Sequence, residues 1–298
     1  MTSAAERRPV VVGIGEVLWD VYPDGAHLGG APANFACHAA ALGAEAWIIS
    51  AVGADELGDR AVDQLRVQGA RVDHIARDSE HATGCVNVTL DAEKRPAFEI
   101  ATDAAWDHIP WSDGLEQLAG RTDAVCFGTL AQRSPVSRET LHRFLREMRP
   151  SALRIFDVNL RQDFHDREMI ERSLELASAM KLNEDELPVV ASLCGIHPAK
   201  TPGTLKALAR QFALQLVALT CGPRGAILVA GDEESVEPAA AVRVVDTVGA
   251  GDAFTAALVC DFLRGASLTD ANRRANAVAA FVCSLPGAAA GVGRAPSH

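Results

Sequence analysis

Short apolar runs alternate with helical segments along most of the chain, and this alternation constrains the fold more than any other feature. PVVVGIGEVLWDV at 9–21 is predicted to form a first buried strand, and NFACHAAALGA at 34–44 the helix after it. AWIISAVG at 46–53 is a second predicted strand, and the amphipathic segment 56–70 is a helix that Gly69 closes. Strands that alternate with helices imply right-handed βαβ units in a mainly parallel sheet, flanked by helices on both faces.

The same pattern continues to the end of the chain. Four short apolar runs end in polar residues or glycine: DAVCFG, RIFDVNL, AMKLN and LVALTCG. Helical stretches such as 138–148 and 201–213 separate them, and two more helices follow Asp252. The sequence therefore predicts an α/β fold in one domain, residues 1–298.

Two stretches, about 17–30 and 81–101, break the alternation. Both show apolar residues at every second position with no helix between, which is typical of strands with one buried face. We expect them to form a small separate antiparallel sheet that acts as a lid.

Composition narrows the class of protein. The 298 residues carry a net charge of −11, which argues against nucleic acid or an anionic membrane as the main partner. No apolar run reaches the roughly 18 residues of a membrane span, and no secretory signal opens the chain. Seven cysteines stand singly with no CxxC pair, so we expect reduced, buried thiols in a cytoplasmic protein. The nine histidines show no HExxH or paired spacing, which makes a zinc site improbable.

The stretch VVDTVGAGDAF at 244–254 carries the strongest chemical signal. Gly249, Ala250 and Gly251 precede a predicted helix, whose free amides would form an anion hole at its positive end. Asp252 lies beside this anion and is a candidate general base for an attacking hydroxyl. On composition alone, Asp252 as an N-cap and Asp246 as a turn residue is an equal alternative.

The string DTVGAGDAF resembles the second signature of the ribokinase-like (PfkB) carbohydrate kinases. LGGAPANFACHAAALGA at 28–44 is similar to the N-terminal Gly-Gly signature of that family, and AVGADELGD to the segment that follows it. KLNEDE at 181–186, LTCGPRGA at 219–226 and ANAVAAFVCSLPGA at 275–288 match further elements in order. The resemblance covers nearly the whole chain and implies a ribokinase-like fold and phosphoryl transfer from MgATP to a sugar.

The resemblance assigns one group of residues to the sugar. Glycines at 29 and 30 allow close backbone approach, although alone they would suggest an ordinary turn. Asp20 can accept hydrogen bonds from paired hydroxyls, and Asn34 supplies a donor and an acceptor. DVNLR adds Asn159 and Arg161, with Arg161 expected to meet the phosphoryl group or a substrate carboxylate. Arg161 in a structural salt bridge is the alternative. The proposed sugar ligands are Asp20, Gly29, Gly30, Asn34, Asn159 and Arg161.

A second group is assigned to the nucleotide and its ions. The resemblance places ATP against Asn183, Thr220, Gly222, Gly225 and Asn276. Asn183 and Glu186 lie three apart at a helix start, where Glu186 would hold Mg²⁺ through water, although a helix cap explains the same spacing. Asp246, with the loop around 284–287, would hold a monovalent cation such as K⁺. The sequence SLPG stands there in place of the familiar Arg-Lys-Gly.

The acceptor sugar is the open question. GGAPANFA, AAWDHI and DVNLR together are most similar to bacterial fructokinases. Arg161 also suits 2-keto-3-deoxygluconate. Leu18 and Trp19 stand where ribose kinases carry a polar residue, which argues against ribose; a nucleoside acceptor is less favoured still. A non-catalytic sugar or nucleotide sensor would be expected to lose the base or an anion-hole glycine. A homodimer through the apolar face of NVTLDAEKRPAFEI at 87–100 is a further hypothesis.

Overall fold

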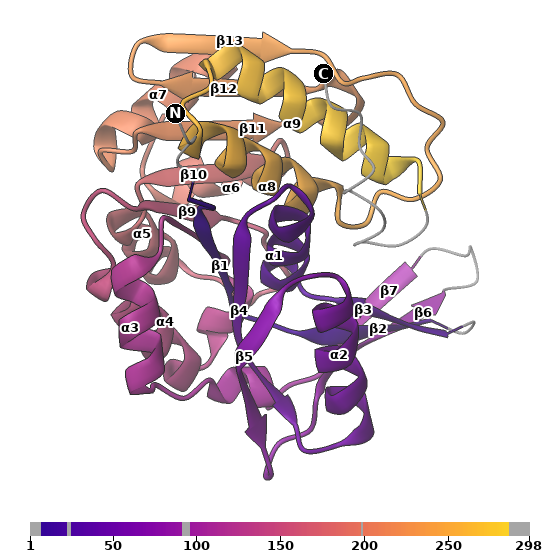
Figure 1. Cartoon of the computed structure of the whole chain (residues 1–298). Coiled ribbons are helices and arrows are strands. Elements are labelled where there is room, and N and C mark those ends of the chain that lie inside the picture. Colours follow the sequence, from indigo (N-terminus) through magenta and orange to yellow (C-terminus); the bar gives the residue numbers. More distant parts are fainter. Residues whose placement is uncertain (1–6, 23–24, 91–95, 198, 286–298) are drawn as a thin grey trace, which may run out of the picture.

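A nine-stranded sheet forms the centre of the molecule. The computed structural model describes residues 7–22, 25–90, 96–197 and 199–285. Seven strands run parallel, and β12 and β13 extend the sheet as an antiparallel hairpin (Figure 1). In spatial order the strands are β13 (Glu233–Glu237), β12 (Ala226–Ala230), β11 (Leu216–Thr220), β10 (Ala179–Asn183), β9 (Leu153–Asp157), β8 (Ala124–Phe127), β1 (Val10–Ile14), β4 (Glu45–Gly53) and β5 (Arg71–Asp78).

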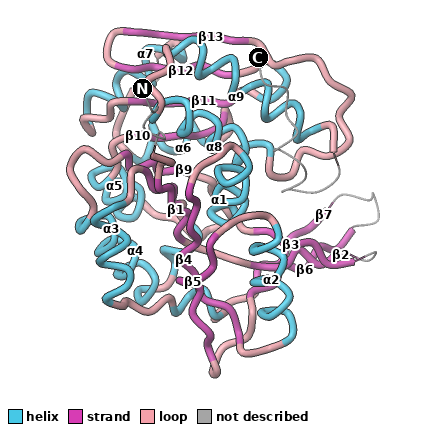
Figure 2. Tube along the Cα trace, viewed as in Figure 1, coloured by secondary structure: helices cyan, strands magenta, loops and turns pink. Residues whose placement is uncertain are grey.

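Helices cover both faces of this sheet, as the alternation predicts (Figure 2). One hydrophobic core lies beneath α1 (Ala31–Ala41), α2 (Glu56–Val67), α8 (Ala250–Leu263) and α9 (Leu268–Cys283). The other lies beneath α3 (Asp113–Arg121), α4 (Pro135–Glu147), α5 (Arg167–Leu176), α6 (Glu186–Leu193) and α7 (Thr201–Gln211). Short 3₁₀ turns are η1 (Ala105–His108), η2 (Leu130–Arg133) and η3 (Gly222–Arg224). The predicted α/β class is confirmed.

The predicted first strand, 9–21, divides at Gly15. Gly15 has a φ of +146°, which favours glycine, and a Cβ there would lie 2.8 Å from Cγ of Pro32. The chain turns at this point, so β1 stays in the large sheet and β2 (Leu18–Tyr22) leaves it. Apolar patterning continues through the bend because both strands are buried at this junction.

The small sheet projects from the side of the molecule (Figure 1). It contains β3 (Gly25–Gly29), β2, β6 (Gly84–Leu90) and β7 (Pro96–Ile100), in that order. β2 pairs antiparallel with β3, and β6 with β7, but β2 and β6 run parallel because each leaves the main body in the same direction. Most side chains of the hypothesised dimer segment 87–100 lie outside the described residues.

Two predictions about the chain's environment can be compared with the structure. Among the described residues, no helix combines the length and apolar character that crossing a membrane requires. All seven cysteines are free, and five of them are buried. The sequence, in which the cysteines stand singly with no CxxC pair, predicts unpaired, buried thiols.

Candidate active site

Polar side chains gather where the central parallel strands end. Asp157, Asn183 and Thr220 are the last residues of β9, β10 and β11, and Glu16 follows β1 closely. Parallel strands present their carboxyl ends at one edge of the sheet, so these residues meet there. The N-terminus of α8 reaches the same edge, with α1 packed beside it (Figure 1).

Asp252 lies in the first turn of α8 and is held from α1. The side-chain amide of Asn34 donates a hydrogen bond to Oδ2 of Asp252 at 2.8 Å. The pKa of Asp252 is raised to about 7, because burial, and after it the charge of Asp157, outweigh the lowering effect of the Asn34 hydrogen bond. A carboxylate with this pKa can exchange a proton near neutral pH.

A buried ion pair lies directly beneath this turn. Nζ of Lys181 is 3.0 Å from Oδ1 of Asp157, and the hydroxyl of Thr255 donates to Oδ2 of Asp157 at 3.1 Å. Burial alone would lower the pKa of Lys181, but the charges of Asp157, Glu186 and Asp252 together outweigh it and the pKa is raised. A Cβ added at Gly251 would lie 3.0 Å from Nζ of Lys181. The ammonium therefore adds positive charge immediately under the α8 N-terminus.

The three anion-hole residues differ in what their amides can do. Gly249 is the N-cap of α8 in the left-handed conformation, with φ of 76°. The N–H of Ala250 donates to the carbonyl of Thr247 at 3.3 Å. Helix geometry leaves the N–H groups of Gly251 and Asp252 without intrahelical acceptors. An anion would thus be bound mainly by the amides of 251 and 252.

Glu16 is a buried carboxylate that the sequence prediction missed. Its Oε1 accepts a hydrogen bond from the first amide of α1, that of Ala31, at 3.2 Å, while Oε2 is buried with no partner among the described residues. Burial raises the pKa of Glu16 to about 7. The backbone of Glu16 also packs closely against Gly30: a Cβ at position 30 would lie 2.3 Å from the carbonyl oxygen of Glu16. Only glycine fits at position 30, which has φ of 111°.

The predicted sugar ligands lie on both sides of the junction with the small sheet. Asp20 on β2 faces Gly29 on β3, where a Cβ would be 2.5 Å from Oδ2 of Asp20. Burial raises the pKa of Asp20, and the charges of Arg161 and His27 oppose this. Arg161 also lowers the pKa of Glu16 and of Asp252, so its exposed guanidinium acts on three carboxylates. The guanidinium of Arg161 donates a hydrogen bond to the carbonyl of Leu160 at 3.1 Å.

Two further predicted sugar ligands, Asn34 and Asn159, make contacts within the protein itself. Asn34 is buried and serves Asp252 through its amide nitrogen. Asn159 has a φ of 43°, and its carbonyl accepts a hydrogen bond from the hydroxyl of Thr129 at 3.3 Å. Its conformation turns the chain between β9 and Arg161, which directs Arg161 toward the carboxylates.

Asn183 and Glu186 form a reciprocal cap at the start of α6. Oδ1 of Asn183 accepts from the amide of Glu186 at 2.9 Å, and Oε2 of Glu186 accepts from the amide of Asn183 at 2.8 Å. Oε1 of Glu186 accepts from the amide of Leu160 at 3.0 Å. Each carboxylate oxygen has one such bond and retains a lone pair for a water molecule. The capping alternative is therefore present, and it remains compatible with Mg²⁺ held through water.

The predicted nucleotide residues fall into two environments. Gly222 and Gly225 enclose the turn η3 after β11, both with positive φ, and a Cβ at Gly225 would lie 2.0 Å from the carbonyl oxygen of Glu237. Thr220 donates to the carbonyl of Leu182 at 3.4 Å. Asn276 is buried in α9 and donates to the carbonyl and side-chain oxygens of Asn272 at 3.0 and 2.9 Å.

Asp246 lies between the turn before α8 and the end of α9. Its Oδ1 accepts from the amide of Val248 at 3.0 Å, and its own amide donates to the carbonyl of Cys283 at 3.2 Å. Ser284 and Leu285 follow α9, whereas Pro286 and Gly287 of the predicted cation loop lie outside the described residues.

The sequence prediction missed Lys181 and Glu16, although the sequence around each residue held a signal that could have identified it. Lys181 interrupts the apolar run AMKLN, and a lysine inside a buried strand requires a charged partner. Glu16 directly follows the glycine that ends β1, at the position where ligands collect in parallel sheets. Their partners, Asp157 and Ala31, come from other parts of the chain.

Known proteins are similar to this chain in sequence and in fold. Residues 24–293 match the pfkB family carbohydrate kinase. The uncharacterized sugar kinase PH1459 of Pyrococcus horikoshii is 32% identical over 270 residues, covering 88% of this chain and 82% of that protein. A fructokinase of Salmonella typhimurium is 30% identical over 249 residues, covering 81% and 79%. The crystal structure of PH1459 in complex with ATP superposes with a TM-score of 0.80, at 29% identity over 94% of each chain.

The fold, the order of the motifs and the family match agree. A half-buried carboxylate at the N-terminus of a helix, beside free amides and a buried ammonium, is an arrangement suited to phosphoryl transfer. The chain belongs to the pfkB family of carbohydrate kinases and is a sugar phosphotransferase.

Proposed function

We propose that this kinase transfers the γ-phosphoryl group of ATP to a hydroxyl of fructose. The observation that carries the proposal is Asp252, a half-buried carboxylate with a pKa of about 7 at the N-terminus of α8. Its neighbours are the two first-turn amides and Lys181. A base, an anion site and positive charge occupy one small volume.

Asp252 accepts the proton of the attacking sugar hydroxyl. The sugar oxygen forms a bond to the γ-phosphorus while the bond from that phosphorus to the β,γ-bridging oxygen breaks, so ADP leaves with the electron pair. The proton remains on Asp252 until solvent removes it. Asn34 keeps the carboxylate oriented through its 2.8 Å hydrogen bond.

The charge of the transferring group is held by this chain's amides and cations. The N–H groups of Gly251 and Asp252 point from the positive end of α8, and Lys181 lies beneath them. Glu186, beside Asn183, would hold Mg²⁺ through water, and the ion would supply further charge neutralisation on the phosphates. Because these groups are fixed by the fold, little reorganisation accompanies the reaction.

The sugar occupies the junction of the two sheets. Asp20 accepts hydrogen bonds from hydroxyls, and Gly29 and Gly30 allow the backbone to approach the ring. Asn159 and Arg161 close the pocket from the end of β9. The small sheet acts as a lid that excludes water, which would otherwise compete as acceptor.

The nucleotide lies along the ends of β10 and β11. Thr220, Gly222 and Gly225 bind ribose and phosphates, and Asn276 lies toward the base. Val244 and Val245, 60% and 57% exposed before α8, offer apolar surface to the nucleobase. Asp246 forms part of a site for a monovalent cation such as K⁺. Equal turnover in Na⁺ and K⁺ would contradict this assignment.

Fructose is favoured by the 30% identical fructokinase of Salmonella typhimurium. The exposed guanidinium of Arg161 supports a second candidate, the sugar acid 2-keto-3-deoxygluconate, since it can bind a carboxylate. The apolar Leu18 and Trp19 disfavour ribose, because both are buried beside Asp20.

An ATP-consumption assay with fructose, 2-keto-3-deoxygluconate, ribose and adenosine tests the proposal. We expect kcat/KM for fructose to exceed the others by at least about tenfold, since one misplaced polar group costs about that much or more. If the enzyme prefers 2-keto-3-deoxygluconate and Arg161→Lys abolishes that preference, the sugar acid replaces fructose as the proposed acceptor. Binding of sugar or ATP without turnover of any acceptor would favour the sensor.

A further inference from the structure

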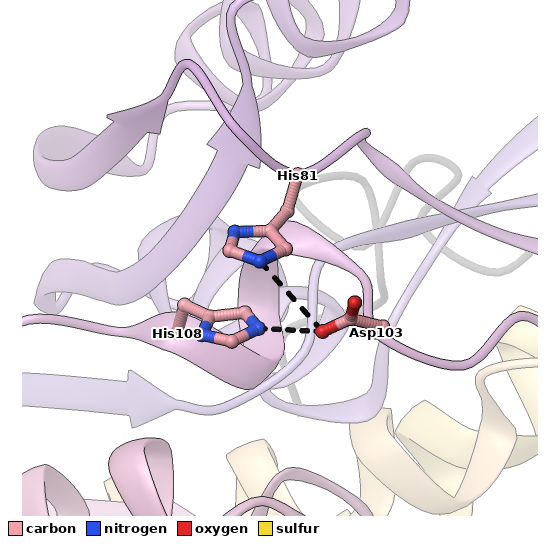
Figure 3. A group of neighbouring side chains, drawn as sticks. All are labelled: His81, Asp103 and His108. Carbon is pink, nitrogen blue, oxygen red and sulfur yellow. Dashed lines mark hydrogen bonds and ion pairs between the residues drawn. The ribbon is translucent and has the colours of Figure 1, made fainter.

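Two histidines and an aspartate meet at the base of the small sheet. His81 lies between β5 and β6, while Asp103 and His108 follow β7 (Figure 3). The β6–β7 hairpin therefore leaves the main body at one member of the cluster and returns at the other two. None of the three belongs to the residues assigned above to the sugar or nucleotide.

The donor atoms of these side chains converge. Nε2 of His108 is 2.8 Å from Oδ1 of Asp103, and Nε2 of His81 is 3.7 Å from the same oxygen (Figure 3). The two imidazole rings stack at 3.6 Å with an angle of 9° between them. One ligand atom from each residue lies within 4.8 Å of the others.

A fourth residue fixes the tautomer of His81. Oδ2 of Asp78 is 2.8 Å from Nδ1 of His81, and Oδ1 of Asp78 accepts from the amides of Glu80 and His81. An ionised carboxylate only accepts, so Nδ1 carries the proton and Nε2 presents its lone pair toward Asp103. A carboxylate behind a ligating histidine is the usual outer partner in metal sites.

We propose that His81, Asp103 and His108 bind one Zn²⁺ ion, with water completing the coordination. Zinc takes nitrogen ligands at about 2.0–2.1 Å and carboxylate oxygens at about 2.0–2.2 Å, which places tetrahedral ligand atoms roughly 3.3 Å apart. The observed separations of 2.8 and 3.7 Å lie on either side of this value. Two stacked parallel rings cannot both direct an in-plane lone pair at one ion, so binding requires the His108 ring, 29% exposed, to tilt out of the stack, while Asp103, 73% exposed, shifts with it.

The ion would join the two connections of the β6–β7 hairpin. His81 belongs to the segment entering the hairpin and Asp103 to the segment leaving it. An ion that binds only the folded protein raises its stability in proportion to the logarithm of ion concentration over Kd. The site is thus a clamp at the base of the small sheet, and it requires no part of the kinase reaction.

Zinc titration of the metal-free full-length protein against a chromophoric chelator tests the site. We expect His108→Gln and Asp103→Asn each to weaken one zinc equivalent by at least about tenfold, as lost ligands do. Asp78→Asn, which keeps the turn and all three ligands, should weaken the same equivalent by about 10–100-fold. His197→Gln, an exposed histidine remote from the cluster in sequence, is the matched control and should leave it unchanged.

Two independent readouts make the outcome decisive. Co²⁺ in place of zinc should give a visible d–d spectrum in wild type that His108→Gln alters, and zinc should raise Tm in wild type more than in that variant. Equal zinc stoichiometry and affinity in wild type and His108→Gln would overturn the proposal. So would a wild-type Co²⁺ spectrum that His108→Gln leaves unchanged, because cobalt would then be bound elsewhere.

Discussion

At the scale of single residues, Asp252 combines a functional need with a cost in stability. Its folded pKa of about 7 is above the ordinary value of 3.8, so the folded protein binds more protons than the unfolded chain between these pH values. The associated stability is fully present below about pH 4 and is lost as pH rises through 7. Burial, which tunes the base, is the physical cause of both effects.

Asp252→Asn separates the two effects. We expect kcat to fall at least about 10²-fold, because the amide cannot accept the hydroxyl proton. Chemical denaturation at pH 8 should show the variant as stable as wild type or more so, by up to a few kcal/mol, since the buried charge is gone. Near-normal turnover would refute the assignment of the base.

Asn34→Ala tests how the base is tuned. The Asn34 hydrogen bond lowers the pKa of Asp252, so its loss should move the acid limb of the kcat/KM profile from about pH 7 toward higher pH. A profile of unchanged midpoint and reduced height would instead indicate that Asn34 acts only on the sugar.

At the scale of elements, α1 and β9–β10 position the site through contacts that leave no spare room. α1 begins at Gly30 against the backbone of Glu16, and β10 carries Lys181 to Asp157 on β9. In both places the geometry depends on one small or one charged residue. Substitutions at these positions test the packing of α1, β9 and β10, and not the chemical step itself.

Gly30→Ala should destabilise the protein by about 2 kcal/mol or more. Its Cβ would lie 2.3 Å from a carbonyl oxygen, and the φ of 111° is unfavourable for alanine. Gly120→Ala in α3 is the control: a Cβ there meets nothing within 4 Å, so a helical alanine should stabilise by about 0.5–1 kcal/mol. Urea denaturation of both variants measures the difference, and equal values would contradict the described packing.

Lys181→Met should cost about 3–5 kcal/mol, because it leaves Asp157 buried without its partner. In the double variant with Asp157→Leu, much of that stability should return. Activity should stay low in both if the ammonium serves the anion site. Recovery of kcat together with stability would limit Lys181 to a structural role.

At the scale of the whole molecule, the proposed active site lies where the two sheets meet. The large sheet supplies the ends of β9, β10 and β11, and β2 and β3 supply Asp20 and Gly29. Ligand-induced closure would therefore involve the small sheet moving against a rigid body.

Hydrogen exchange measured with and without substrates tests this closure. Amides of β2 and β3 should exchange more slowly when sugar is bound, while those of the central strand β9 should change little because they are already protected. Nucleotide alone should protect the turn η3 and the start of α8. Equal protection of both sheets by sugar would argue for global stabilisation in place of closure.

Local sequence patterns were sufficient to predict much of the fold and part of the candidate site. The alternation of apolar runs predicted the α/β sheet, and the glycines around Asp252 predicted a helix with free amides, because both features depend on neighbours along the chain. Period-two patterning located the small sheet but not the parallel pairing of β2 with β6, which depends on how two distant segments leave the body.

What the sequence determined by itself was the set of elements, the order of the family's motifs and the position of one candidate base. Only the tertiary structure decided the partners: Asn34 on Asp252, Asp157 on Lys181, and His81 beside His108. These contacts join residues distant along the chain. The pKa shifts of Asp252 and Lys181 come from burial and neighbouring charge, which exist only once the chain is packed.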